Sequence, residues 1–76
     1  MPRYFFNTFD GRHFVDSVGE ELPDKHAAWA EATKTAGEIL RDLDGRLEVG
    51  STWRLEVTDE FRNPLFVIHV HAEKVS

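Results

Sequence analysis

Two histidines, His69 and His71, occupy alternate positions in an apolar segment of the sequence. If this segment is a strand, both imidazoles lie on one face, about 7 Å apart along it. Such a pair could bind a metal ion, but a catalytic zinc site normally has three protein ligands. Glu56 and Glu73 are the nearest candidates for a third ligand, because we expect His13 on the opposite, helix-side face. We therefore interpret the two histidines as a solvated pair and keep a metal-dependent site as an alternative.

Three pairs of acidic residues are the other candidates for a catalytic role, and the members of each pair are adjacent or two positions apart. They are Glu20 with Glu21, Asp42 with Asp44, and Asp59 with Glu60. Glycoside hydrolysis needs two carboxylates facing each other across a cleft, whereas these fall at predicted turns and at a helix end. Ser-nucleophile, phosphate-loop and H-E-x-x-H motifs are absent, and there is no cysteine. We also expect a 76-residue chain to be too short to enclose a pocket of about 300 Å³ alone. The sequence therefore predicts no enzyme and no cofactor.

Charge and composition restrict the possible partners. Fourteen acidic residues outnumber nine basic ones, for a formal net charge of −5, and the basic residues are scattered. This pattern argues against nucleic acid, which requires clustered Lys or Arg. Aromatic residues near Arg3, Arg12 and Arg54 still resemble a stacking platform, so single-stranded nucleic acid stays an alternative. No apolar run is long enough to span a membrane, and the absence of cysteine and of a signal-peptide pattern favours the cytoplasm.

The elements that position these residues follow from periodicity. Residues 3–9 and 12–17 predict two strands joined by a two-residue Asp10-Gly11 turn, and residues 17–22 predict a loop. A helix of about 20 residues begins at Pro23-Asp24 and is capped at Gly45. Its apolar face consists of Trp29, Ala32, Ala36, Leu40 and Leu43. Residues 52–58 and 64–71 predict two further strands. Residues 1–76 are thus a single α+β domain, ββαββ, with one helix on a four-stranded sheet.

The strand order is predicted from which strands are apolar on both faces. The first and last strands have this character, which is typical of central strands, while the second and third are more mixed. These positions give the order 2-1-4-3, in which the first and last strands are parallel neighbours, as in a β-grasp fold. The side under the helix is expected to carry Tyr4, Phe6, Val15, Trp53, Leu55, Val57, Phe66, Ile68 and Val70.

The other side of the sheet, which the helix leaves open, is also expected to carry large apolar residues. A two-residue turn pairs Phe9 with Arg12 and Asn7 with Phe14, which places Phe14 on this open face. The predicted interaction face consists of Phe5, Phe9, Phe14, Leu65 and Val67, with Phe61 exposed at a nearby turn. An exposed apolar patch of this kind indicates a homodimer or another protein as partner. In the alternative interpretation, the loop at 45–51, with Leu47 and Val49, covers part of it.

Several motifs together resemble a known family. They are the opening MPRYFF, the Asp10-Gly11 turn, Glu21-Leu22-Pro23-Asp24 before an Ala-rich helix, and the strand that starts at Trp53-Arg54-Leu55. In these the chain resembles a family of short alpha-proteobacterial, often rhizobial, proteins that form a domain of unknown function. The resemblance implies a bacterial, cytoplasmic, single-domain protein and brings no activity or cofactor. Phe61 departs from the polar turn usual in that family, and the two histidines of 69 and 71 are not among its typical residues.

Overall fold

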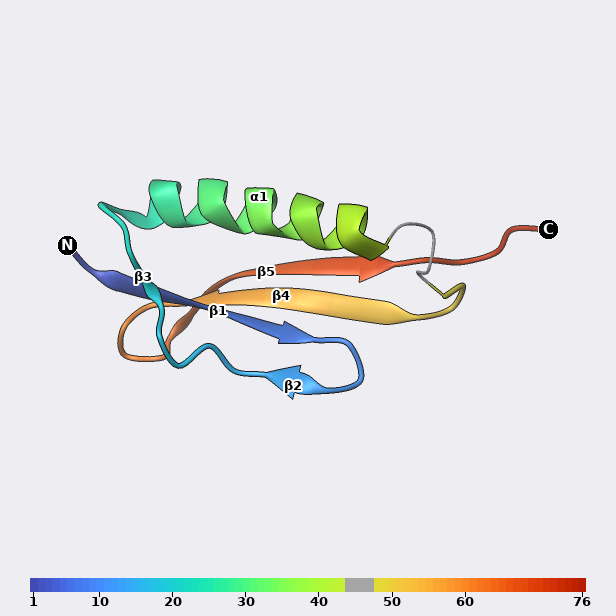
Figure 1. Cartoon of the computed structure of the whole chain (residues 1–76), viewed down its shortest axis with the longest axis horizontal. Helices are drawn as coiled ribbons and strands as arrows, with labels where there is room; N and C mark the ends of the chain where they lie inside the picture. The colour runs from blue at the N-terminus through green and yellow to red at the C-terminus, as the bar shows by residue number, and fades with distance from the viewer. Residues whose placement is uncertain (44–47) are drawn as a thin grey trace.

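The computed structural model describes residues 1–43 and 48–76 of the chain. Within them it forms an antiparallel sheet with α1 on one side (Figure 1). The elements are β1 (Arg3–Phe9), β2 (His13–Phe14), β3 (Glu20–Glu21), α1 (Lys25–Leu43), β4 (Thr52–Thr58) and β5 (Pro64–His71). The predicted α+β class and the helix are confirmed. The predicted cap at Gly45 and the loop residue Leu47 lie outside the described residues.

The sheet has five strands among the described residues, where four were predicted. Its order is β2-β1-β4-β5, and β3 pairs with the start of β1, at Arg3 and Tyr4, so the predicted order 2-1-4-3 is wrong. The first strand pairs antiparallel with β4, not parallel with β5. Strand β4 is central because its alternation suits a sheet with one covered face: Trp53, Leu55 and Val57 are buried, while Arg54 and Glu56 face the open side. Strand β5, although apolar on both faces, lies at the edge.

The connection between β1 and β2 is one residue longer than predicted. Phe9 pairs with His13, and Thr8 with Phe14, so Asp10, Gly11 and Arg12 all lie in the turn. Gly11 has a φ of 98°, which glycine adopts without strain. A shift of one residue exchanges the two faces of a strand. Phe14 therefore lies on the helix side with Thr8, and His13 lies on the open side, opposite to both predictions.

The segment after β2 leaves the sheet ladder and rejoins it as β3. The predicted strand at 12–17 is confirmed only for His13–Phe14, and the predicted loop contains β3, which pairs with Arg3 and Tyr4 of β1. Between them the Asp16 carboxylate accepts hydrogen bonds from the backbone N–H groups of Phe6, Val18 and Gly19, at 3.2, 3.0 and 3.0 Å. A side chain thus replaces strand pairing at this edge.

Helix α1 starts where the sequence predicts, because the Asp24 carboxylate accepts a hydrogen bond from Ala27 N at 2.8 Å. Its buried face is made of the small residues Ala28, Ala32 and Ala36. Trp29, predicted on that face, is instead 40% exposed, and its ring contacts Phe66 with centroids 5.1 Å apart. Alanines let the helix approach the sheet closely.

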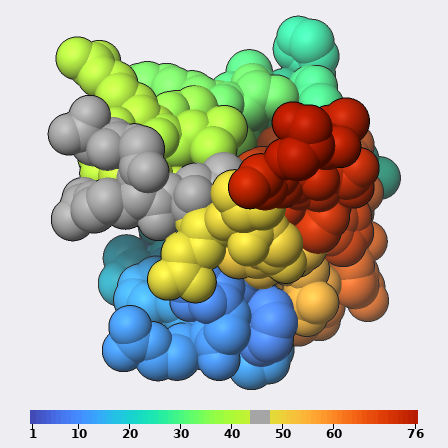
Figure 2. Space-filling view, turned by 90° about the vertical axis from the view of Figure 1, so that its right-hand side faces the viewer, coloured from blue at the N-terminus to red at the C-terminus, as the bar shows by residue number. Residues whose placement is uncertain are grey.

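The core lies between α1 and the sheet, where α1 packs mainly over β4 and β5. Figure 2 looks at the end where α1 terminates and shows the helix above and the β1–β2 hairpin below. All residues predicted under the helix belong to this core or pack against it, except Val15, which is exposed. Because the helix lies toward β5, Phe14 on β2 remains uncovered on the helix side, 65% exposed.

Candidate functional site

The open face of the sheet carries a row of side chains that crosses four strands. His13, Phe9, Arg54 and His69 lie opposite one another on β2, β1, β4 and β5. The Phe9 ring contacts His13, with centroids 4.4 Å apart, and the Arg54 guanidinium lies 4.8 Å from its centre. This cation–π contact covers the ring. Phe9 is thus on the open face as predicted, but a cation partly shields it.

The second predicted aromatic residue of this face, Phe5, is covered in the same way. It is buried, and the Arg62 guanidinium lies 3.8 Å from its ring centre. Arg62 also donates a hydrogen bond to the Asp16 backbone oxygen at 3.1 Å. Sequence patterns did not point to Arg62, because the residue lies in a turn far from Phe5 along the chain.

The turn between β4 and β5 holds Arg62 in place. Asp59 Oδ1 accepts hydrogen bonds from the N–H groups of Phe61 and Asn63, at 2.8 and 2.9 Å. Arg62 has a φ of 68°, the left-handed conformation that such a turn requires. The hydrogen bond from the Asn63 backbone, with those from its side chain and from Phe61, lowers the pKa of Asp59. Phe61 lies at the tip of this turn, 77% exposed.

The remaining residues of the predicted face lie on β5. Val67 is on the open face and is 43% exposed. Leu65 is different: it falls where the register shifts between Val57 and Thr58, is partly buried, and packs against the core cluster. With Phe14 on the helix side and Leu65 packed on the core, the predicted five-residue patch is reduced to Val67 and two shielded rings.

Strand β5 presents a different kind of surface, its backbone edge. It pairs with β4 on one side, and no described residue pairs with its other side. The segment from Pro64 to His71 contains no Asp, Glu, Lys or Arg. Its helix-side residues pack on the core, and Phe66 contacts Trp29 at the margin of α1. An unpaired, uncharged and apolar edge offers a row of hydrogen-bonding groups to another strand.

The two histidines of β5 do not converge on a common third ligand. His71 Nδ1 lies 2.7 Å from Thr52 Oγ1, and its Nε2 lies 3.8 Å from Glu73. His69 faces Arg54, whose charge disfavours a metal cation there. His13 now shares their face, but three strand spacings, about 14 Å, separate it from His69. No group of three or more metal-binding side chains occurs within residues 1–43 and 48–76.

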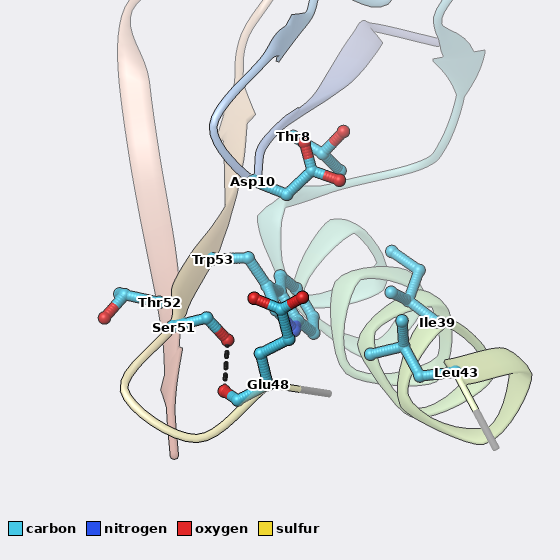
Figure 3. A pocket seen from close by; sticks show the side chains of 8 residues that line it. All are labelled: Thr8, Asp10, Ile39, Leu43, Glu48, Ser51, Thr52 and Trp53. Atoms are coloured by element: carbon cyan, nitrogen blue, oxygen red, sulfur yellow. Dashed lines mark hydrogen bonds between the residues drawn. The ribbon is translucent and has the colours of Figure 1, made fainter. Parts of the chain in front are cut away.

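A cavity of about 460 Å³ opens between the end of α1 and the sheet (Figure 3). Its volume lies within the range of small-molecule sites, but the cavity is open to solvent, so the described residues do not enclose it. The cavity forms because α1 lies over β4 and β5 and leaves the end of β1 uncovered. The lining residues are Thr8, Asp10, Ile39, Leu43, Glu48, Ser51, Thr52 and Trp53.

Trp53 is the most deeply buried part of this lining. It is 5% exposed, and in the part of the chain that the structure describes its indole Nε1–H has no hydrogen-bond acceptor. Figure 3 shows Ile39 and Leu43 on the helix, across the cavity from Trp53. The sequence indicated Trp53 as a core residue, but periodicity cannot show that its polar atom lacks a partner.

Comparisons with known proteins identify a family but no function. A family described as a domain of unknown function, DUF6894, matches residues 3–71. No curated protein and no solved structure matches the chain. In the described part of the chain, no helix has the length and the apolar character needed to cross a membrane.

Proposed function

This chain belongs to DUF6894, a domain of unknown function, and we propose that it is a small non-enzymatic interaction module that forms a homodimer. The associating surface is the β5 edge together with the adjoining open face around Val67. The observation that supports the proposal most directly is the mismatch between the composition of β5 and its position. A strand that is apolar on both faces is typical of a sheet interior, whereas β5 is an edge strand.

Pairing with a second copy of β5 removes this mismatch. A two-fold axis normal to the sheet would place the two β5 strands antiparallel, so that each becomes central in a continuous sheet. The free N–H and C=O groups of the edge would then find partners in a geometry that only another strand supplies. Another protein could also supply a strand, and the experiment below distinguishes that outcome.

Charge favours a second copy at this surface. The chain has a net charge of −5, so most surfaces of two copies repel each other. Strand β5 has no formal charge, and its charged neighbours on the open face of β4 are Arg54, opposite His69, and Glu56, opposite Val67. Two copies can therefore meet along β5 without placing like-charged side chains of that strand against each other.

Both sides of the β5 strand would gain contacts. On the open face, Val67 would approach its counterpart or a near neighbour on the partner strand. On the helix side, the pair formed by Trp29 and Phe66 lies beside the edge and is only partly covered. Burying such rings supplies most of the affinity of typical interfaces. This arrangement includes the β5 part of the predicted open-face patch and excludes Phe14.

Equilibrium sedimentation at micromolar concentration tests the proposal. We expect a dimer for the natural sequence and a monomer for Val67→Lys, with Kd raised at least about tenfold, equivalent to 1.4 kcal/mol. Val18→Lys is the matched control, because Val18 is also exposed but lies in the loop before β3. A natural chain that stays monomeric, or two variants that behave alike, would overturn the proposal.

The proposal includes a bacterial, cytoplasmic setting for this module, as the family resemblance implies. The absence of cysteine fits a reducing compartment.

Binding of single-stranded nucleic acid is not supported, because guanidinium groups already lie over the two open-face rings on which a base would stack. Fluorescence anisotropy with a mixed-sequence oligonucleotide at low salt should therefore show no binding.

A further inference from the structure

We propose that the dimer has a second layer, in which the α1 helices of the two copies pack against each other. The Trp29 side chain of each copy inserts between Thr33, Ala36, Gly37 and Leu40 of the partner's helix. This inference rests on the proposed pairing of two β5 strands. It follows from an uncharged side of α1, from a glycine that nothing in the described chain covers, and from the direction of the free N–H groups of β5.

One side of α1, which we call the uncharged stripe, has no Asp, Glu, Lys or Arg. The contact of Trp29 with Phe66 places this stripe at the margin of β5. Trp29 and Leu40, two large apolar residues on it, are 40% and 42% exposed. The stripe consists of His26, Trp29, Thr33, Ala36, Gly37 and Leu40. Spacings of three and four residues that repeat over two heptads are typical of a helix that packs along another helix.

Gly37 lies within the uncharged stripe. A glycine inside a helix lowers its stability by about 1 kcal/mol relative to alanine. Apart from the backbone of its own helical turns and its chain neighbours, no described atom lies within 4 Å of a Cβ added at Gly37. No contact within the described chain therefore requires a glycine here. A large side chain from a second copy would occupy the space beside it.

The free N–H groups of β5 determine how two copies can pair. Ala72 N donates a hydrogen bond to the Ser51 backbone oxygen at 3.2 Å, so the backbone groups of Ala72 point to the β4 side. Successive residues of a strand point these groups to alternate sides. The backbone groups of Ile68 therefore point toward β4, and those of Val67 and His69 point away from it and can pair with a second strand.

A two-fold axis at Ile68 suits this edge best. With this axis, Val67 lies opposite the partner's His69 on both sides of the axis, and their free backbone groups pair. An axis at His69 would place two imidazoles opposite each other, each beside a guanidinium group of β4. An axis at Val67 would place His71 opposite Asn63, which lies in the turn before β5. The axis at Ile68 avoids both arrangements.

The same axis determines which parts of the two helices meet. Helix α1 and β5 run in the same direction (Figure 1), and Trp29 lies against Phe66. The axis at Ile68 lies two strand residues, about 6.6 Å, beyond Phe66. This length corresponds to about four residues of a helix, so the axis passes beside Thr33. Symmetry about Thr33 places Trp29 opposite the partner's Gly37.

Four residues of α1 surround the point that the partner's Trp29 reaches. They occupy positions i, i+3, i+4 and i+7, the set that encloses one side chain in knobs-into-holes packing: Thr33, Ala36, Gly37 and Leu40. Three of the four are small, which leaves room for an indole. Because α1 packs over β4 and β5, the two helix axes lie about two strand spacings, or about 10 Å, apart. Such a separation suits packed helices.

A charge-complementation experiment tests the helix layer. Thr33 of each copy faces the partner's Thr33, so Thr33→Lys should raise the Kd of the dimer at least about tenfold in equilibrium sedimentation, as should Thr33→Glu. An equimolar mixture of the two variants should recover a dimer with a Kd within about threefold of the natural value, because opposite charges then meet. Thr35→Lys is the matched control and should leave Kd unchanged, because residues 33 and 35 point to different sides of α1.

The position of Trp29 is followed with 5-fluorotryptophan incorporated into the full-length chain. The ¹⁹F resonance of Trp29 should shift as the protein concentration rises through Kd. The resonance of Trp53, which is buried in the core of each copy, should keep its position. A Trp29→Phe variant assigns the two resonances.

The possible outcomes separate the two layers. A natural chain that stays monomeric contradicts the pairing of β5 and, with it, the helix layer. A dimer that Val67→Lys disrupts but Thr33→Lys does not leaves the pairing of β5 in place and overturns the helix layer. A mixture that associates no better than its two components, or a Trp29 resonance that does not depend on concentration, overturns the helix layer in the same way.

Discussion

The two edges of the sheet differ in how they treat their backbone hydrogen bonds. On the side of β1 away from β4, the partner strands β2 and β3 are each two residues long. Between them, the Asp16 carboxylate accepts hydrogen bonds from backbone N–H groups, and we call this side the protected edge. At the β5 edge, eight residues run without a charged side chain, and on the side away from β4 they have no partner strand among the described residues. Short strands and side-chain caps prevent edge pairing. Of the two edges, the β5 edge is the one that leaves its backbone groups open to another strand, which supports the association proposed there.

The largest effect is expected from Gly19, which lets the protected edge fold. Its φ is 72°, and an added Cβ would lie 2.9 Å from the Tyr4 carbonyl oxygen. Gly19→Ala should therefore lower the free energy of unfolding by about 3 kcal/mol, through strain and a backbone clash. Urea denaturation measures this. An effect below about 1 kcal/mol would show that the β3 edge is not held as described.

Gly37→Ala is the control for that substitution. Gly37 lies inside α1, and apart from the backbone of its own helical turns and its chain neighbours, nothing lies within 4 Å of an added Cβ. Because alanine favours helix, this variant should raise the free energy of unfolding by about 0.5–1 kcal/mol. Opposite signs for the two variants in the same urea series would separate local strain from a general response to glycine replacement.

The second effect concerns the Asp16 carboxylate and its pH dependence. Burial raises the pKa of Asp16, but hydrogen bonds from Gly19, Phe6 and Val18 and the charge of Arg62 outweigh it and lower the pKa below 3.8. A lowered folded-state pKa stabilises the chain above the unfolded-state value, and this stability disappears as the pH falls through the folded-state value.

Asp16→Asn should therefore lower the free energy of unfolding by about 1–3 kcal/mol at neutral pH, because it weakens hydrogen bonds to a charged acceptor. The variant should also lose less stability than the natural chain between pH 5 and pH 2. Thermal unfolding across that range measures both. Parallel pH profiles would mean that Asp16 contributes no charge-dependent stability, with Asp59 left as the other carboxylate of lowered pKa.

The smallest effect is expected from Phe14, on the protected edge. Its side chain is 65% exposed on the helix side of β2. Phe14→Ser should change the free energy of unfolding by less than about 0.5 kcal/mol and should leave association unchanged. Sedimentation and urea denaturation check both. Loss of the dimer in this variant would move the interface to the β2 edge and reverse the comparison.

The sequence predicted the faces of the long strands well because strict alternation determines them. Trp53, Leu55 and Val57 lie under the helix as expected, and Asp24 caps the helix. The same logic failed for Phe14, because Asp-Gly is compatible with a two- or a three-residue turn, and one extra residue exchanges the faces.

Strand order and the cavity required information that periodicity does not contain. A strand that is apolar on both faces suggests a central position in the sheet of a single copy. It fits equally well at an edge that a second copy covers. The cavity depends on where α1 rests across the sheet, and the Trp53 N–H has no acceptor among the described residues. Both are tertiary features, and neither leaves a pattern in the spacing of residues.

Hydrogen exchange at low and high protein concentration tests the central claim most directly. Pairing of two β5 edges predicts that β5 amides between Pro64 and His71 become more protected as concentration rises. Amides of β2 and β3, on the protected edge, should exchange at the same rate throughout, and Val67→Lys should abolish the difference. If β5 exchange does not depend on concentration, or if protection rises at β2 and β3 instead, the proposed role of the β5 edge is wrong.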